Sequence, residues 1–463
     1  MLTLIPSGSR ERIDQDQALE ITAEWLAFIR KNESPSTLEL KIVLTNKSYS
    51  PEAAHVIADF VTSTEHFNPC LASLVTSLDL SDIIAGQNTE DGLAVLQTFA
   101  QAFVGSSLLE HLDLSDNAMG TRGMPCCEAL FTEPRPLKSL SLCNNGLSLE
   151  AMQQVADWLV TRNMSMHLEK LHFFNNMSGD EGCMAFQHLL NHCSPVNLSS
   201  IRYASTRASI PGSKLIMTGL VNFVQRVTDG GVASMTYLDL TDNKLKGENA
   251  HLLAQALHAM PHLEYINLSE CDMKNQGLHV IASSLLEHKC ITHLDLSGNL
   301  ITSDGVSPQS PFIQLLKKIG PNLKVLKMQD NTLTSKGVAN IVRTMSRGPC
   351  ALVELTLGNN EFGPNGVTQL IRSADTLLPT LEHLGIHENF LSDNDVEKLV
   401  KIFGGILHGH DENIEDSDFE DASLEEEEEE EYEETETDNE QDKKDENQFD
   451  NLTQTLSQVH INK

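Results

Sequence analysis

The chain has 463 residues, enough for two or three compact domains or for one long solenoid. Its formal net charge is −34, and residues 411–450 contribute −21 of it through 23 acidic residues and 2 lysines, which leaves −13 for the remainder. Because phosphate binding needs a basic surface, this balance argues against a nucleic-acid partner and favours a basic protein.

The cysteines and the apolar segments indicate in which cellular compartment the protein is expected. Nine cysteines are scattered without a Cys-x-x-Cys pair, which is typical of reduced thiols in a cytosolic or nuclear protein. The N-terminus lacks a basic segment followed by a long apolar run, and no stretch reaches the length of a membrane-spanning helix. We therefore expect neither a signal peptide nor insertion into a membrane.

Residues 1–35 are predicted to form an N-terminal cap. A helix that covers the open end of the following core is predicted from Ala18, Leu19, Ile21, Trp25, Leu26 and Ile29. The next segment, Lys41–Phe60, resembles a degenerate first repeat.

A unit of the form Leu-x-x-Leu-x-Leu-x-x-Asn then recurs through residues 36–405. Its second Leu is predicted to be the first inward strand residue, and successive copies are separated by 28 to 37 residues, which leaves room for a helix between strands. This pattern is typical of leucine-rich repeats and predicts an α/β solenoid: a crescent of the ribonuclease-inhibitor type, with a parallel sheet inside and helices outside. The strand positions are Leu78, Leu112, Leu140, Leu171, Ile201, Leu238, Ile266, Leu294, Leu326, Leu355 and Leu384.

Helices are visible between these strands. Leu253, Ala256, Leu257 and Met260 follow helical spacing, as do Leu278, Ile281 and Leu285. Glycine-bearing segments at Ser178–Gly182, Thr302–Gly305, Thr334–Gly337 and Gly363–Gly366 are predicted helix starts whose Ser, Thr or Asp residues act as caps. The longest step contains Asp229-Gly230-Gly231, a predicted loop.

The C-terminal residues have a different composition. Residues 406–448 hold the run SLEEEEEEEYEETETDNE, which cannot bury enough apolar surface to fold and is predicted to be a disordered acidic tail. Residues 449–463 regain Phe449, Leu452, Leu456 and Val459, which fit either a short amphipathic segment or a frayed terminus.

The repeat also predicts which polar side chains face inward. The final Asn of each unit should turn in to satisfy backbone groups, and the residue before it should face outward on the rim of the solenoid. The inward set is Asn117, Asn145, Asn176, Asn243, Asn299, Asn331, Asn360 and Asn389; the rim set is Asp82, Asp116, Asn144, Asn175, Ser205, Asp242, Glu270, Gly298, Asp330, Asn359 and Glu388. The outward strand residues include four further carboxylates: Asp79, Asp113, Asp239 and Asp295. This edge is either a binding surface for a basic partner or simply polar because it is exposed to solvent.

No catalytic motif of a hydrolase is present: the chain has no phosphate-binding loop, no His-Glu-x-x-His and no Gly-x-Ser-x-Gly. We expect no enzyme activity of its own, no cofactor and no metal. Binding is the expected task.

Particular segments are more specific than the repeat. LTSLDLSDIIAG, LEHLDLSDNAMG, LSLCNNGLS, LEKLHFFNNMSGDEG and YASTR resemble the GTPase-activating proteins of Ran, closest to the plant type, over residues 40–440. The resemblance implies activation of GTP hydrolysis by Ran in its GTP form, in the cytoplasm or at the nuclear envelope, in support of nucleocytoplasmic transport. Such proteins are understood to order Ran's own glutamine without an arginine finger.

The resemblance also implies roles for single residues. Asn144, in the motif Leu-Cys-Asn-Asn-Gly, would act at the catalytic site. The residues expected to contact Ran are Asp82, Gln87, Asp116 and Asn175. Gln87 stands where relatives usually have arginine, and its amide cannot offset transition-state charge as a guanidinium does.

The chain departs from plant relatives at its N-terminus as well, because the targeting domain expected there is not matched. Ran-binding proteins and transport receptors are further candidate partners. Two other functions stay open from the sequence: a protein-binding scaffold or inhibitor of the ribonuclease-inhibitor kind, and an acidic histone chaperone.

Overall fold

The computed structural model describes residues 1–32, 39–227, 231–414 and 419–421, all within one compact unit, Met1–Ser423. The predicted boundary at residue 35, most of the predicted loop at Asp229–Gly231 and most of the predicted acidic tail lie outside the described residues. None of the described helices is long and apolar enough to cross a membrane.

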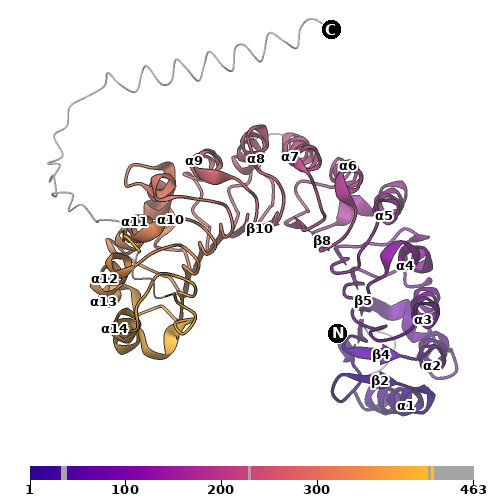
Figure 1. Cartoon of the computed structure of the whole chain (residues 1–463). Coiled ribbons are helices and arrows are strands. Elements are labelled where there is room, and N and C mark those ends of the chain that lie inside the picture. Colours follow the sequence, from indigo (N-terminus) through magenta and orange to yellow (C-terminus); the bar gives the residue numbers. More distant parts are fainter. Residues whose placement is uncertain (33–38, 228–230, 415–418, 422–463) are drawn as a thin grey trace, which may run out of the picture. The chain divides into compact units, whose positions relative to one another are not determined.

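A parallel sheet runs through the whole unit and lines its inner side (Figure 1). Its strands pair in sequence order, from β1 beside β3, through β5 and its successors, to β15 beside β16. The strands of this sheet are β1 Leu2–Leu4, β3 Leu40–Val43, β5 Val75–Asp79, β6 His111–Asp113, β7 Ser139–Ser141, β8 Lys170–Phe174, β9 Ser200–Ala204, β10 Tyr237–Asp239, β11 Tyr265–Asn267, β12 His293–Asp295, β13 Val325–Lys327, β14 Glu354–Thr356, β15 His383–Gly385 and β16 Leu407–His408. A second sheet pairs β2 Glu11–Ile13 with β4 Lys47–Tyr49.

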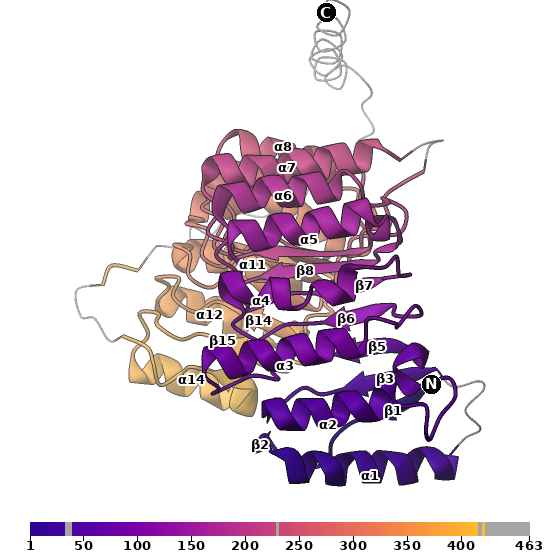
Figure 2. The same ribbon diagram turned by 90° about the vertical axis from the view of Figure 1, so that its right-hand side faces the viewer.

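Helices follow the strands and form the outer layer, where they lie side by side in Figure 2. The helices are α1 Gln15–Asn32, α2 Pro51–Thr62, α3 Thr89–Ala102, α4 Gly120–Cys126, α5 Leu149–Thr161, α6 Gly179–Leu190, α7 Ile210–Gln225, α8 Glu248–Leu257, α9 Lys274–Ser284, α10 Pro311–Ile319, α11 Thr334–Ser346, α12 Pro364–Arg372, α13 Ala374–Leu377 and α14 Asp393–Phe403. A helix is about 10 Å wide whereas paired strands lie about 4.8 Å apart, so stacked strand–helix units curve with the sheet inside.

The register confirms the predicted α/β solenoid. Every predicted inward residue pairs with its counterpart on the next strand, for example Leu78 with Leu112 and Leu355 with Leu384. These residues are at most 2% exposed, so one continuous apolar core fills the space between sheet and helices. The sheet also extends beyond the predicted range, because β1 joins it at one end and Leu407 pairs with Leu384 at the other.

The predicted helix caps are wrong in several repeats. Ser178 makes no capping hydrogen bond to α6, and Ser303–Val306 is a single 3₁₀ turn, so α10 begins later, at Pro311. Side-chain caps instead precede α2, α3, α5, α10 and α14, where the acceptors are Ser50, Asn88, Ser148, Ser310 and Ser392. The predicted helix starts are nevertheless right in three of the four segments, because α6, α11 and α12 begin within them.

The inward asparagines tie neighbouring repeats together, as predicted. Asn299 donates to the carbonyls of Leu268 (2.8 Å), Leu296 (3.0 Å) and Ser297 (3.1 Å), and its Oδ1 accepts from the backbone N–H of Cys271 at 3.1 Å. All eight predicted members are at most 4% exposed. Since buried backbone groups need partners, each asparagine stabilises the turn at which the chain leaves the sheet.

We expect Asn299→Ala to lower the free energy of unfolding by about 2–4 kcal/mol, because several buried backbone groups would lose their partner. Urea denaturation followed by circular dichroism measures this change. The matched control is Gln276→Ala on the exposed face of α9, which should change stability by less than about 0.5 kcal/mol. Equal effects of the two substitutions would contradict the role assigned to the asparagine.

Candidate functional site

The rim residue of every repeat adopts a left-handed backbone conformation. Its φ lies between 50° and 65° in all eleven predicted rim positions, from Asp82 (50°) to Glu388 (53°). Asn, Asp and Gly tolerate this conformation best among the amino acids. The abundance of Asp and Asn on the rim therefore reflects the backbone as well as any partner.

The outward strand aspartates have a structural explanation too. Asp79, Asp113 and Asp295 each accept a hydrogen bond from the backbone N–H two residues further on, at 2.9–3.0 Å, where the strand ends. Asp239 makes the same bond to Thr241 and is only 1% exposed, so its assignment to an acidic surface is wrong.

Four of the five predicted site residues line one open cavity of about 630 Å³ near the N-terminal end of the rim: Asp82, Gln87, Asp116 and Asn144. The fifth, Asn175, is hydrogen-bonded to Asn144. The N-terminal loop contributes Arg10 to the same cavity, and sequence reasoning missed this residue because its loop carries no repeat signal.

Three of these side chains form a chain of hydrogen bonds along the rim. Nδ2 of Asn144 donates to Oδ1 of Asp116 at 2.7 Å, and Nδ2 of Asn175 donates to Oδ1 of Asn144 at 3.0 Å. The nitrogen and the oxygen of the Asn144 side-chain amide are therefore each held by one hydrogen bond. An amide group has two N–H donors and two acceptor lone pairs, so one donor and one lone pair remain for a partner.

Gln87 is turned toward the scaffold. Its Nε2 donates to the backbone carbonyl of Tyr49 at 2.5 Å and to Oγ of Ser48 at 3.2 Å, which ties the loop after β5 to β4. The structure thus gives Gln87 a structural role in addition to its place in the cavity wall.

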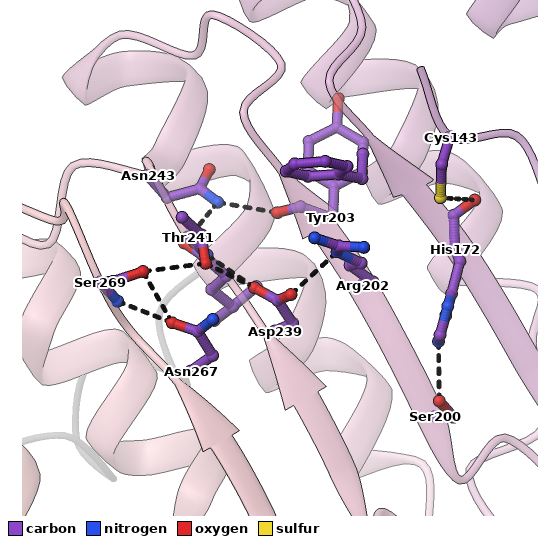
Figure 3. A network of polar contacts seen from close by, with 12 residues as sticks. Cys143, His172, Ser200, Arg202, Tyr203, Asp239, Thr241, Asn243, Asn267 and Ser269 are labelled. Carbon is purple, nitrogen blue, oxygen red and sulfur yellow. Dashed lines mark hydrogen bonds and ion pairs between the residues drawn. The ribbon is translucent and has the colours of Figure 1, made fainter. Parts of the chain in front are cut away.

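Beneath the rim, the concave face carries the polar network of Figure 3. The guanidinium carbon of Arg202 lies 3.6 Å from the centroid of the Phe174 ring, and its Nε lies 2.9 Å from Oδ2 of Asp239. Because Phe174 directly precedes Asn175, this stacking supports the strand end that carries the last residue of the rim chain.

His172 belongs to the same surface. Its Nε2 lies 2.8 Å from Oγ of Ser200, and its ring stacks on Tyr237 with 5.4 Å between centroids. Burial lowers the pKa of His172 to about 3, and the positive charges of Lys170 and Arg202 act in the same direction. The imidazole is therefore neutral at pH 7.

No group of His, Cys, Asp and Glu able to hold a metal ion occurs within residues 1–32, 39–227, 231–414 and 419–421. The chemistry that this site offers is hydrogen bonding from oriented amides, two rim carboxylates and one guanidinium. These are means of binding and orienting another molecule.

Fold and comparison together define the class of the protein. Residues 105–124, 259–282, 287–308 and 321–342 match the family model "Leucine Rich repeat". Together with the strand register, these matches show that the chain folds as an α/β solenoid of leucine-rich repeats.

Parts of the chain are similar to proteins of other organisms. RAN GTPase-activating protein 1 of Arabidopsis thaliana is 31% identical over 138 residues, which are 30% of this chain and 23% of that protein. NACHT, LRR and PYD domains-containing protein 14 of Mus musculus is 26% identical over 63% of this chain and 28% of its own length. Ribonuclease inhibitor of Sus scrofa is 24% identical over 68% of this chain and 78% of its length. The chain thus spans about a quarter of the first two relatives.

The neutral state of His172 predicts a pH dependence. Its pKa is lowered on folding, so the unfolded chain binds more protons below pH 6.5, and stability falls by about 1.4 kcal/mol per pH unit from there toward pH 3. Between pH 7 and 5.5, wild type should lose about 1 kcal/mol more than His172→Gln, as measured by urea denaturation. The control is His251→Gln in α8, where the side chain is exposed. A wild-type loss equal to that of His172→Gln would show that the imidazole protonates freely.

Proposed function

We propose that this chain is a GTPase-activating protein for Ran in its GTP form, acting in the cytoplasm or at the nuclear envelope in nucleocytoplasmic transport. The observation that carries the proposal is the oriented amide of Asn144 at the edge of the rim cavity. The similarity to the Arabidopsis RAN GTPase-activating protein over 138 residues supports the choice of partner.

The proposed mechanism requires no nucleotide site on this chain. Ran supplies the nucleotide and the glutamine that positions the attacking water, and Asn144 holds that glutamine with its remaining donor and acceptor. Preorganised polar groups stabilise a transition state because they need no reorientation during the reaction. The hydrogen bond that Asn144 donates to Asp116 and the one that it accepts from Asn175 provide this preorganisation.

Docking would use the acidic rim. Asp82 and Asp116 present carboxylates beside Asn144, and the steering of a basic partner surface follows from their charge. Asn175 would contribute by holding Asn144 and by contacting the partner.

A protein-binding scaffold or inhibitor is the second candidate. It is favoured by a row of rings on the concave face, where Tyr237 and Tyr265 stack at 4.2 Å between centroids and Tyr265 lies 5.7 Å from His293. Aromatic side chains are enriched in protein interfaces. The histone-chaperone alternative depends on the acidic tail, most of which lies outside the described residues. A GTPase assay separates both from the leading proposal, because neither predicts any stimulation of Ran.

Asn144→Ala should slow stimulated GTP hydrolysis by about 10²-fold in a single-turnover phosphate-release assay with purified Ran·GTP, as expected for one preorganised polar group. The matched control is Asn359→Ala. Asn359 occupies the same repeat position with φ of 50° and donates to Asp330 at 3.0 Å, far from the cavity along the chain. A rate equal to that of the control would remove Asn144 from the mechanism.

Gln87→Ala should leave the stimulated rate nearly unchanged and lower stability by about 1 kcal/mol, because its amide serves the scaffold. The same phosphate-release assay and a thermal melt measure the two effects. A loss of rate as large as that of Asn144→Ala, with an unchanged melting temperature, would show that Gln87 acts in the reaction.

A further inference from the structure

The short strand β4 anchors both walls of the rim cavity. On one wall, Oγ of Ser48 donates to the carbonyl of Ala85 at 2.7 Å, and the carbonyl of Tyr49 accepts from Gln87. On the other wall, Lys47 holds the N-terminal loop. The loop with Gln87 and the loop with Arg10 therefore share one support.

Lys47 is an unusual residue for this task, since its side chain is only 3% exposed. Its Nζ donates to the carbonyls of Ser7 (2.9 Å) and Ser9 (2.5 Å) and to Oε1 of Glu11 (2.8 Å). An ammonium group has three donors, and here each has an acceptor, which offsets the loss of hydration. The residues on either side of Arg10 are thus fixed by a buried, fully paired cation.

Arg10 itself is loosely held. Its Nη2 donates to Oδ1 of Asp82 at 2.8 Å, and its side chain is 63% exposed while that of Asp82 is 15% exposed. A surface ion pair of this kind contributes little to stability. The contact uses one of five N–H donors of the guanidinium, so Arg10 can exchange Asp82 for another acceptor at small cost.

Among the described residues that line the cavity, Arg10 is the one cation, and Asp82 and Asp116 are the carboxylates. Gln87, on the opposite wall, is neutral, and its amide donates to the backbone carbonyl of Tyr49. A guanidinium nevertheless enters this cavity, from a different segment of the chain.

We propose that Arg10 is a binding residue that receives an anionic oxygen group of the docked complex, either a carboxylate of the partner or a phosphate of its nucleotide. A planar guanidinium matches both groups bidentately, and a basic residue of the partner takes over Asp82 when Arg10 leaves it. This inference rests on the proposed function and adds to it a residue outside the repeat pattern.

The test compares Arg10→Ala and Arg10→Lys with the control Arg12→Ala. Arg12 is exposed on β2, two residues away, and does not line the cavity, so its removal changes the net charge equally. Two quantities are measured: the Kd for Ran loaded with a non-hydrolysable GTP analogue, and the single-turnover rate at saturating protein. We expect Arg10→Ala either to raise the Kd or to lower the saturated rate, by about 10-fold or more. Arg12→Ala should change neither quantity by more than about twofold.

The two sources of the anion give different patterns. A partner carboxylate predicts a higher Kd with an unchanged saturated rate, and partial rescue by Arg10→Lys. A phosphate whose charge grows in the transition state predicts a lower saturated rate with little change in Kd, and poor rescue by lysine. Either pattern supports the inference.

Three results overturn it. If wild type stimulates Ran and Arg10→Ala equals Arg12→Ala, the inference fails while the proposed function stands. If Asp82→Asn alone changes the Kd or the saturated rate as much as Arg10→Ala does, and the double variant shows no further change, Arg10 only positions Asp82. If wild type leaves the intrinsic rate of Ran unchanged, the proposed function fails and this inference fails with it.

Discussion

The buried asparagine that eight of the repeats share is the constraint on which the site depends. Its amide nitrogen donates to carbonyls of its own turn and of the preceding repeat, as Nδ2 of Asn331 does with the carbonyls of Met328 and Leu296. Its oxygen accepts from the preceding repeat's backbone, as Oδ1 of Asn331 does from the N–H of Ile301. Stability in a solenoid is a sum over such contacts between neighbours. The residue before it takes the left-handed conformation and lies on the rim, so Asn145 and its hydrogen bonds hold the turn that carries Asn144.

Asp and Asn are therefore expected on the rim whether or not a partner binds there, because the left-handed backbone favours them. Asp330 and Asn359 repeat the hydrogen bond of Asp116 and Asn144 elsewhere on the rim, so an acid–amide pair alone does not define a site. The candidate site is distinct because the regular repeat is interrupted there. The repeat from Leu78 to Leu112 is longer than most, and its extra residues form the loop that carries Gln87. The N-terminal loop carries Arg10, and both loops contribute to the walls of the cavity.

The periodic part of the structure could be predicted from the sequence, and the non-periodic part could not. The strand register and the buried asparagines follow from a spacing that every repeat shares, and the rim position of Asn144 follows with them. The pairing of β2 with β4 involves Glu11–Ile13 and Lys47–Tyr49, segments of three residues with no repeated pattern. The sequence does not reveal Arg10 for this reason, and it does not reveal the burial of Asp239 because its ion pair with Arg202 depends on a side chain from another repeat.

The use of basic residues elsewhere in this acidic chain supports the assignment of Arg10. Arg135 is 4% exposed and donates to the carbonyls of Phe103, Val104 and Ser106, just past the C-terminal end of α3. Arg226 donates to three carbonyls at the end of α6, and positive charge at a helix C-terminus is favourable. Lys47 likewise satisfies backbone carbonyls. These cations serve the fold, whereas Arg10 contacts one rim carboxylate from an exposed position. Exposed pairs of this kind recur, as between Arg122 and Glu90 at 2.7 Å, so Arg10 is distinguished by its place in the wall of the rim cavity.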